Sequence, residues 1–261
     1  MVKRLKAVWR PALFFLVCLT IGLLINMPVK LVLNQVQIPD NLKISRLQGT
    51  LFSGEVGELG IGQLRINQLT YGIDLSCLLT AAVCYQLAFE GGRVKAGFEP
   101  ISQTIKLSQL DAELPIQQLA AFGNQLLVSP SGSLRVESDV ITIKQGKVVE
   151  FEALTSWTDA GIIGEDFNLG DYQLEITKDS SLYRLILQDK DAMLDIDGEG
   201  KLSSDGNYSL NINIQARAGL DSGIKNALEL VAKKKGLNQY FVRRSGQLDS
   251  KVSGFLFYDV N

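Results

Sequence analysis

Residue types that commonly carry chemistry are scarce in this chain, and none of its 261 residues is a histidine. Ser-His-Asp hydrolysis, histidine-ligated zinc and histidine-based pH switching are therefore excluded. Ser45, Ser53 and Ser156 lack a base that could activate a hydroxyl. The pair Gly91-Gly92 has neither the further glycines nor the following helix of a nucleotide-binding loop. The sequence predicts a protein that is not an enzyme and has no catalytic residue, cofactor or resident metal.

Three groups of charged residues have a plain structural interpretation. Asp195, Asp197 and Glu199 alternate along a strand-like segment, and such carboxylates can perform acid–base chemistry or bind Ca²⁺. Their spacing does not fit an EF-hand loop, so we predict a solvated strand face. The run Lys233-Lys234-Lys235 is expected in the last turn of a helix, where the helix dipole favours cations. Arg243-Arg244 is interpreted as solvated surface in the same way.

Cys77 and Cys84 are close enough in sequence to close a small loop. In an oxidising compartment such a pair forms a disulfide, whereas in the cytosol it supplies thiols or metal ligands. We favour the disulfide, with free buried thiols and redox or metal chemistry as the alternatives. Cys18 lies in an apolar segment and is interpreted as a small apolar residue.

The segment from Pro11 to Val29 contains no charged residue. A helix of this length spans roughly 28 Å, close to the ~30 Å hydrocarbon core of a bilayer. A cleaved signal peptide has a shorter apolar region and a small-x-small cleavage site, but bulky residues and Pro28 stand here. We expect residues 1–10 to be a basic tail, 11–29 an uncleaved transmembrane helix and 30–261 a β-rich domain.

Charge is distributed unevenly along the chain. Residues 1–30 hold five cations and no acid, and the remainder holds 21 cations and 28 acids. Four of the five cations precede the apolar segment, which places the N-terminus in the cytoplasm. The rest of the chain is then expected across the inner membrane, in the periplasm of a diderm bacterium. Its acidic balance disfavours nucleic acid and anionic lipid headgroups as partners.

Period-two alternation of apolar and polar residues dominates the sequence after residue 30, as in half-buried strands. The clearest run is 208–216, and others are 64–66, 94–98, 105–107, 141–143, 172–176, 183–187 and 194–196. Turn-forming segments such as 204–207 separate them, so antiparallel hairpins are expected. The predicted fold is mainly β, an elongated, twisted antiparallel sheet with one or two short helices.

Helices are predicted at Leu114–Phe122 and at Asp221–Lys235, the second ended by Gly236, with a helical turn within Asp74–Val83. The segment Asn124–Gly132 is a plausible seam between two halves, about 31–123 and 133–261. Short similar stretches 83–86 residues apart, around 49–71 and 132–157, suggest a duplicated sheet unit.

Two aromatic–glycine signatures remain. One runs from Gly49 to Gly54 and is followed by Tyr71, and the other is Trp157-Thr158-Asp159-Ala160 followed by a Leu-Gly-Asp-Tyr block. With the apolar segment, they resemble the type II secretion system protein N family, whose pattern is an N-in anchor, G-T-L-[WF]-x-G, a tryptophan-led strand and W-x-D-A…L-G-x-Y. The likeness covers essentially the whole chain. The chain departs from the family pattern in two ways: it has Tyr71 where tryptophan is expected, and it has the pair Cys77 and Cys84. The matching residues, all expected to be structural, are Gly49, Thr50, Leu51, Phe52, Gly54, Tyr71, Trp157, Asp159, Ala160, Gly170 and Tyr172.

The resemblance implies a non-enzymatic, single-pass inner-membrane accessory component of the type II secretion system, which exports folded proteins across the outer membrane. Its partners would be inner-membrane or pseudopilus components of that machinery, contacted in the periplasm. An unpaired edge of the sheet could bind such a partner by strand addition.

An alternative function is a β-groove that binds lipid or another hydrophobic ligand. The family has a more distant likeness to AsmA-like envelope proteins, whose curved sheets present an apolar concave face. The run 208–216 supplies an apolar face here. A periplasmic hydrolase is disfavoured because histidine is missing.

Overall fold

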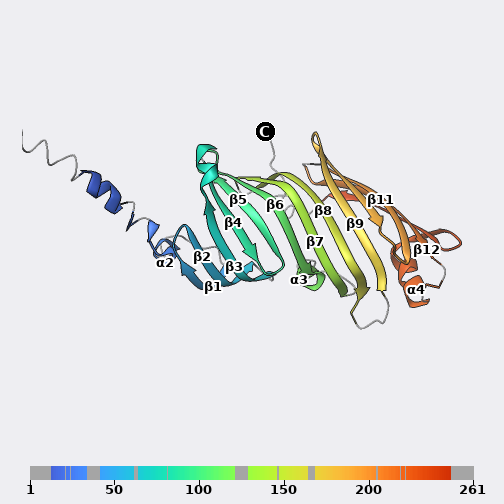
Figure 1. Cartoon of the computed structure of the whole chain (residues 1–261). Coiled ribbons are helices and arrows are strands. Elements are labelled where there is room, and N and C mark those ends of the chain that lie inside the picture. Colours follow the sequence, from blue (N-terminus) through green and yellow to red (C-terminus); the bar gives the residue numbers. More distant parts are fainter. Residues whose placement is uncertain are drawn as a thin grey trace, which may run out of the picture. The chain divides into compact units, whose positions relative to one another are not determined.

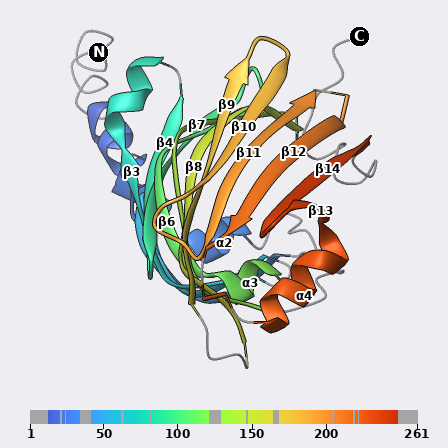
Figure 2. The ribbon, with the colours of Figure 1, turned by 90° about the vertical axis from the view of Figure 1, so that its right-hand side faces the viewer.

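The structure is a computed structural model of the whole chain. It describes residues 13–20, 22–23, 25–33, 42–61, 64–80, 82–120, 129–145, 147–163, 168–203, 205–217, 219–220 and 222–247. The chain divides into two compact units, residues 1–73 with 87–90 (unit 1) and residues 74–86 with 91–261 (unit 2). The strands form a 14-stranded sheet in which β1 to β12 follow in chain order (Figure 1). At its end, β14 lies between β12 and β13 (Figure 2).

The strands are antiparallel to the neighbours with which their registers are described. Their bounds are β1 Leu42–Gly49, β2 Ser53–Ile61, β3 Leu64–Asp74, β4 Val83–Phe89, β5 Gly92–Glu99, β6 Thr104–Pro115, β7 Pro130–Lys144, β8 Lys147–Ile162, β9 Asn168–Asp179, β10 Leu182–Asp189, β11 Leu194–Ser203, β12 Asn207–Ala216, β13 Lys233–Gly236 and β14 Gln239–Gln247. The helices are α2 Val29–Leu33, α3 Ile116–Ala120 and α4 Ser222–Val231, with a 3₁₀ helix, η1, at Leu75–Thr80. The predicted mainly-β antiparallel fold and the helical turn within Asp74–Val83 are confirmed.

Unit 1 carries a row of irregular positions across β1, β2 and β3. Arg46 and Gln68 have left-handed φ values of +53° and +52°, and the pairing registers skip them and Gly57 between them. A Cβ at Gly57 would come within 2.7 Å of Arg46 Nε, so glycine makes room for the arginine. Each of the three strands skips one residue here, so the pairing register is the same on both sides of the row. The core of this unit is formed by Leu47, Val56 and Leu69, with α2 packed against it.

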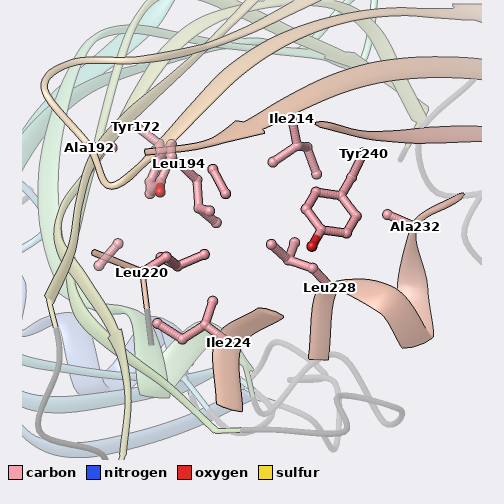
Figure 3. Close-up of a cluster of buried hydrophobic side chains, with 11 residues drawn as sticks. Tyr172, Ala192, Leu194, Ile214, Leu220, Ile224, Leu228, Ala232 and Tyr240 are labelled. Atoms are coloured by element: carbon pink, nitrogen blue, oxygen red, sulfur yellow. The ribbon is translucent and has the colours of Figure 1, made fainter. Parts of the chain in front are cut away.

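The largest buried cluster belongs to unit 2, where α4 lies against one face of the C-terminal strands (Figure 2). Ile224 and Leu228 point from α4 toward Leu194, Ile214 and Tyr240 (Figure 3). Ile224 and Leu228 are four residues apart, about one helical turn, so they lie on the same side of α4. The buried members of the cluster are Ala160, Tyr172, Ala192, Leu194, Ile214, Ala216, Leu220, Ile224, Leu228, Ala232 and Tyr240.

The helix predicted over Asp221–Lys235 is wrong at its C-terminal end. Helix α4 stops at Val231, and the three lysines form β13, which pairs with β14. A turn at residues 237–238, with Asn238 at φ +57°, closes this hairpin. Lysine occurs both in the last turn of helices and on edge strands, so its presence does not distinguish the two. Here the pairing with β14 makes the lysines a strand. Asp221 lies outside the described residues.

The helix predicted over Leu114–Phe122 is also shorter than expected. Leu114 and Pro115 still pair with β7 as the end of β6, and α3 begins only at Ile116. Proline suits this junction because it supplies no N–H to the ladder and precedes a helix well. Residues 121–128, with Phe122 and most of the predicted seam, lie outside the described residues.

Near the N-terminus, residues 13–20 are helical, and Phe14 and Phe15 are 72% and 66% exposed. Among the described residues, no helix combines the length and apolar character needed to cross a bilayer.

Candidate functional site

The residues first considered for chemistry are spread over the sheet. Ser45 lies in β1, Ser53 in β2 and Ser156 in β8, and Gly91 has φ +92° in the turn before β5. The three carboxylates of β11 are exposed, and Glu199 lies 3.7 Å from Arg184. In the described part of the chain, no group of three or more cysteine, aspartate or glutamate side chains could hold a metal ion.

The first motif forms a tight corner between β1 and β2. Gly49 has φ +112°, and the N–H of Thr50 donates to the carbonyl of Ser53 at 2.9 Å. The hydroxyl of Tyr71 donates to the carbonyl of Thr50 at 2.7 Å. A Cβ at Gly54 would lie 2.5 Å from Tyr71 Oη, so only glycine fits beneath the ring. Tyr71 thus holds the corner that connects β1 with β2.

The second motif repeats this construction in unit 2. Trp157 Nε1 donates to the carbonyl of Ser131 at 3.0 Å. The neighbouring Gly132 has φ +108°, and a Cβ there would lie 2.9 Å from Trp157 Nε1. In both motifs, the polar atom of an aromatic side chain binds a backbone carbonyl next to a left-handed glycine. Trp157 also contacts Tyr172, with ring centroids 6.0 Å apart.

The remaining motif residues join β8 to β9. Asp159 has φ +50°, its N–H donates to Asp171 Oδ1 at 2.9 Å, and its Oδ1 accepts from Asn168 Nδ2 at 3.0 Å. Ala160 is 0% exposed. A Cβ at Gly170 would lie 2.8 Å from the Cβ of Ala192. Asp159, Ala160 and Gly170 therefore have structural roles, since they pack and connect the adjoining ends of β8 and β9.

Tyr172 is buried at the same strand end, and its hydroxyl donates to the carbonyl of Leu169 at 3.1 Å. Burial, with a smaller contribution from the charge of Asp189, raises the pKa of Tyr172 to about 12. The phenol therefore stays neutral at physiological pH and acts as a packed hydrogen-bond donor.

A disulfide between Cys77 in η1 and Cys84 in β4 joins these two elements. The neighbouring Asp74 accepts a 2.7 Å contact from Lys95 Nζ and a 2.6 Å hydrogen bond from Ser76 Oγ. The ammonium of Lys95, followed by the Ser76 donors, holds the pKa of the Asp74 carboxyl far below its usual range. The disulfide attaches the segment that precedes β4 to β4 itself, and the ion pair attaches the same segment to β5. All of these contacts lie within unit 2.

Part of the apolar face of unit 2 extends beyond α4. Leu174 pairs with Leu187, and Ile176 pairs with Leu185, on the sheet face that also carries Tyr172. These side chains have intermediate exposure. Among the described residues, they are not members of the cluster beneath α4. The run 208–216 continues this face, as its alternation predicted.

The other prominent surface is the C-terminal edge of unit 2. β14 pairs with β12 along its length, whereas β13 pairs only with Gln239–Phe241. Lys233, Lys234, Lys235, Arg243 and Arg244 are exposed along this edge. Sequence reasoning missed the edge because it placed the lysines in a helix. Asn238, a residue type that tolerates the left-handed φ found there, was the available signal for a turn.

A family model for type II secretion system protein N matches residues 40–243, from the beginning of β1 into β14, and so includes both aromatic–glycine motifs. No curated protein and no solved structure matches the chain. The matched segment makes up most of the sequence, and the chain therefore belongs to the type II secretion system protein N family.

Proposed function

We propose that this protein is a non-enzymatic accessory component of the type II secretion system that acts by protein–protein contacts. The observation that carries the proposal is the family match over residues 40–243, which includes almost the entire sheet. The motif residues form hydrogen bonds with the backbone and pack against neighbouring strands, as expected of a rigid scaffold for docking. Its partners are other inner-membrane or pseudopilus components of the secretion machinery.

The proposed topology is a cytoplasmic tail of residues 1–10, a membrane anchor of residues 11–29 and a periplasmic domain of residues 30–261. The absence of charge between Pro11 and Val29 supports the anchor, and the preceding cations support the orientation. The disulfide fits an oxidising compartment. Alkaline phosphatase fused after Asn261 should be active, and green fluorescent protein at the same position should be dark. The reverse result contradicts this topology.

Secretion by a deletion strain tests the function. We expect folded substrates of the system to accumulate in the periplasm and to reach the medium again when the full chain is restored. A chain whose residues 1–29 are replaced by a cleavable signal peptide should fail to restore secretion. A periplasmic marker enzyme controls for outer-membrane leakage. Normal secretion by the deletion strain contradicts the proposal.

The apolar face of unit 2 supports a second candidate function, the binding of lipid or another hydrophobic ligand. Leu174, Ile176, Leu185 and Leu187 lie side by side with intermediate exposure and outside the cluster beneath α4. Native mass spectrometry of the purified full chain should then show bound phospholipid, and Leu187→Glu should remove it. If the protein released from detergent micelles in the mass spectrometer carries no phospholipid, this function is contradicted.

A further inference from the structure

The C-terminal edge of unit 2 is cationic although residues 31–261 hold 21 cations against 28 acids. Three of the four residues of β13 are lysines, and Arg243 and Arg244 lie in β14. Lys234 Nζ is 2.9 Å from Glu229. Within the described residues, no carboxylate lies at ion-pair distance from the other four cations. The edge therefore keeps an uncompensated positive charge.

The backbone of the same edge is open. β12 pairs with all of β14 on one side, but on the other side β13 pairs only with Gln239–Phe241. Within the described part of the chain, residues 242–247 have no strand on that side. An edge strand directs alternate N–H and C=O groups outward. We call residues 242–247 the β14 edge. This stretch is as long as a typical strand.

The two arginines lie on opposite faces of β14. Arg244 pairs with Leu210, whereas Arg243 pairs with Asn211 and donates from Nε to Asn211 Oδ1 at 2.9 Å. The guanidinium of Arg243 also lies 5.9 Å from the ring centroid of Phe241. These contacts hold the guanidinium of Arg243 in place. The β14 edge therefore has one arginine on each face of the sheet.

We propose that the β14 edge binds an extended acidic segment of a partner protein, which adds to the sheet as a further strand. The inference rests on the proposed function and names the surface and the chemistry of the partner. An incoming strand antiparallel to β14 would place consecutive residues opposite Arg243 and Arg244, so adjacent carboxylates fit best. Its C-terminal end would meet Lys233, which pairs with Phe241.

A protein strand suits this edge better than the other occupants. A second copy of the chain would bring four arginines together across the new pair, which like-charge repulsion opposes. Lipid headgroups could pair with the cations, but they could not form a continuous ladder with the alternating N–H and C=O groups of the open backbone. The acidic strand uses both features.

Binding of short peptides to the purified full chain tests the proposal. The probe is a fluorescent, capped peptide Val-Thr-Val-Glu-Glu-Val-Thr-Val, and fluorescence anisotropy measures its Kd. We expect saturable binding that weakens with salt. Replacing Glu-Glu by Lys-Lys in the peptide should abolish binding, and replacing both threonines by proline should do the same because proline cannot donate to the ladder.

The variant Arg243→Glu/Arg244→Glu should raise the Kd of the acidic peptide by about tenfold or more. Lys190→Glu/Lys201→Glu is the matched control, because both lysines are exposed and the net charge changes equally. The control should bind as the unchanged protein does. Equal binding by the two variants, or by the proline peptide, overturns the proposal. Binding to anionic phosphatidylglycerol vesicles without peptide binding overturns it in favour of lipid.

Secretion separates this inference from the proposed function. If deletion of the protein blocks secretion and Arg243→Glu/Arg244→Glu restores it fully, the accessory role stands and the β14 edge is not the docking site. If the variant folds, loses peptide binding and fails to restore secretion, both are supported. If deletion leaves secretion normal, the proposed function fails, and the peptide measurements alone decide whether the edge binds acidic strands.

Discussion

The hydroxyl of Tyr71 donates a 2.7 Å hydrogen bond to the carbonyl of Thr50, directly after the left-handed Gly49. Trp157 makes the equivalent bond to the carbonyl of Ser131, directly before the left-handed Gly132. The donor atom and ring size differ, but each aromatic side chain holds an irregular stretch of backbone. Tyr71 holds the turn between β1 and β2, and Trp157 holds the register shift at the start of β7. Tyr71 therefore performs, with its hydroxyl, the task that an indole N–H performs in unit 2.

Removing the Tyr71 hydroxyl should loosen the first corner. Tyr71→Phe leaves the Thr50 carbonyl without this donor, and we expect a loss of about 0.5–1.5 kcal/mol in the free energy of unfolding. Urea unfolding followed by circular dichroism measures it. Tyr208→Phe is the control, because the Tyr208 hydroxyl has no hydrogen-bond partner among the described residues. An equal effect of the two substitutions would show that the Tyr71 bond contributes nothing.

The sequence predicts this fold well where side-chain alternation decides it. The runs at 172–176, 183–187 and 208–216 lie in β9, β10 and β12 because one face is apolar in each. It does not predict the left-handed Arg46 and Gln68 in mid-strand, since neither residue type favours that conformation.

The functional surface is harder to predict than the fold. The Gly49 motif marks a turn between strands and the Trp157 motif marks a register shift between β7 and β8, so their residue types reveal structure but no partner. The β14 edge depends on where α4 stops, and lysines suit both a last helical turn and an edge strand. Only the pairing of β13 with β14 brings those lysines to the same edge as the arginines.

Two glycines of unit 1 should respond differently to alanine. A Cβ at Gly54 would lie 2.5 Å from Tyr71 Oη and would also contact the Gln48 carbonyl, so Gly54→Ala should cost roughly 1–3 kcal/mol. Gly72 has nothing within 4 Å of the same position. Gly72→Ala should be neutral or should stabilise by up to about 1 kcal/mol, because it restricts the unfolded chain. Urea midpoints of both variants check this, and a costlier Gly72→Ala would refute the packing argument.

The disulfide should stabilise its own segment rather than the whole chain. Closing so short a loop contributes about 2–3 kcal/mol in the chain-entropy model. Cys77→Ser/Cys84→Ser should therefore speed hydrogen exchange over η1 and β4 and leave β9–β12 unchanged. Cys18→Ser is the control, because Cys18 is a free cysteine. Faster exchange throughout unit 2 would contradict a local role.

The Asp74–Lys95 ion pair should give this segment a particular pH dependence. The pKa of Asp74 lies below its ordinary value of 3.8 in the folded chain, so the carboxylate stabilises the fold fully above that value. The contribution is lost as the pH falls toward the folded pKa. Asp74→Asn should therefore be less stable than the unchanged protein at pH 7, and the difference should shrink below about pH 4. Urea unfolding across this range measures it, and a constant difference would exclude the charge as its cause.

Helix α4 offers a matched pair of substitutions for the buried cluster of unit 2. Leu228 is 7% exposed and packs within the cluster, whereas Val231 on the same helix is 49% exposed. Leu228→Ala should cost about 2–4 kcal/mol, because it removes buried apolar surface and leaves a cavity. Val231→Ala should cost less than about 1 kcal/mol, because half of its side chain already contacts solvent. Hydrogen exchange should also quicken in β11, β12 and β14 for Leu228→Ala alone. Equal costs would mean that α4 does not hold these strands through its buried face.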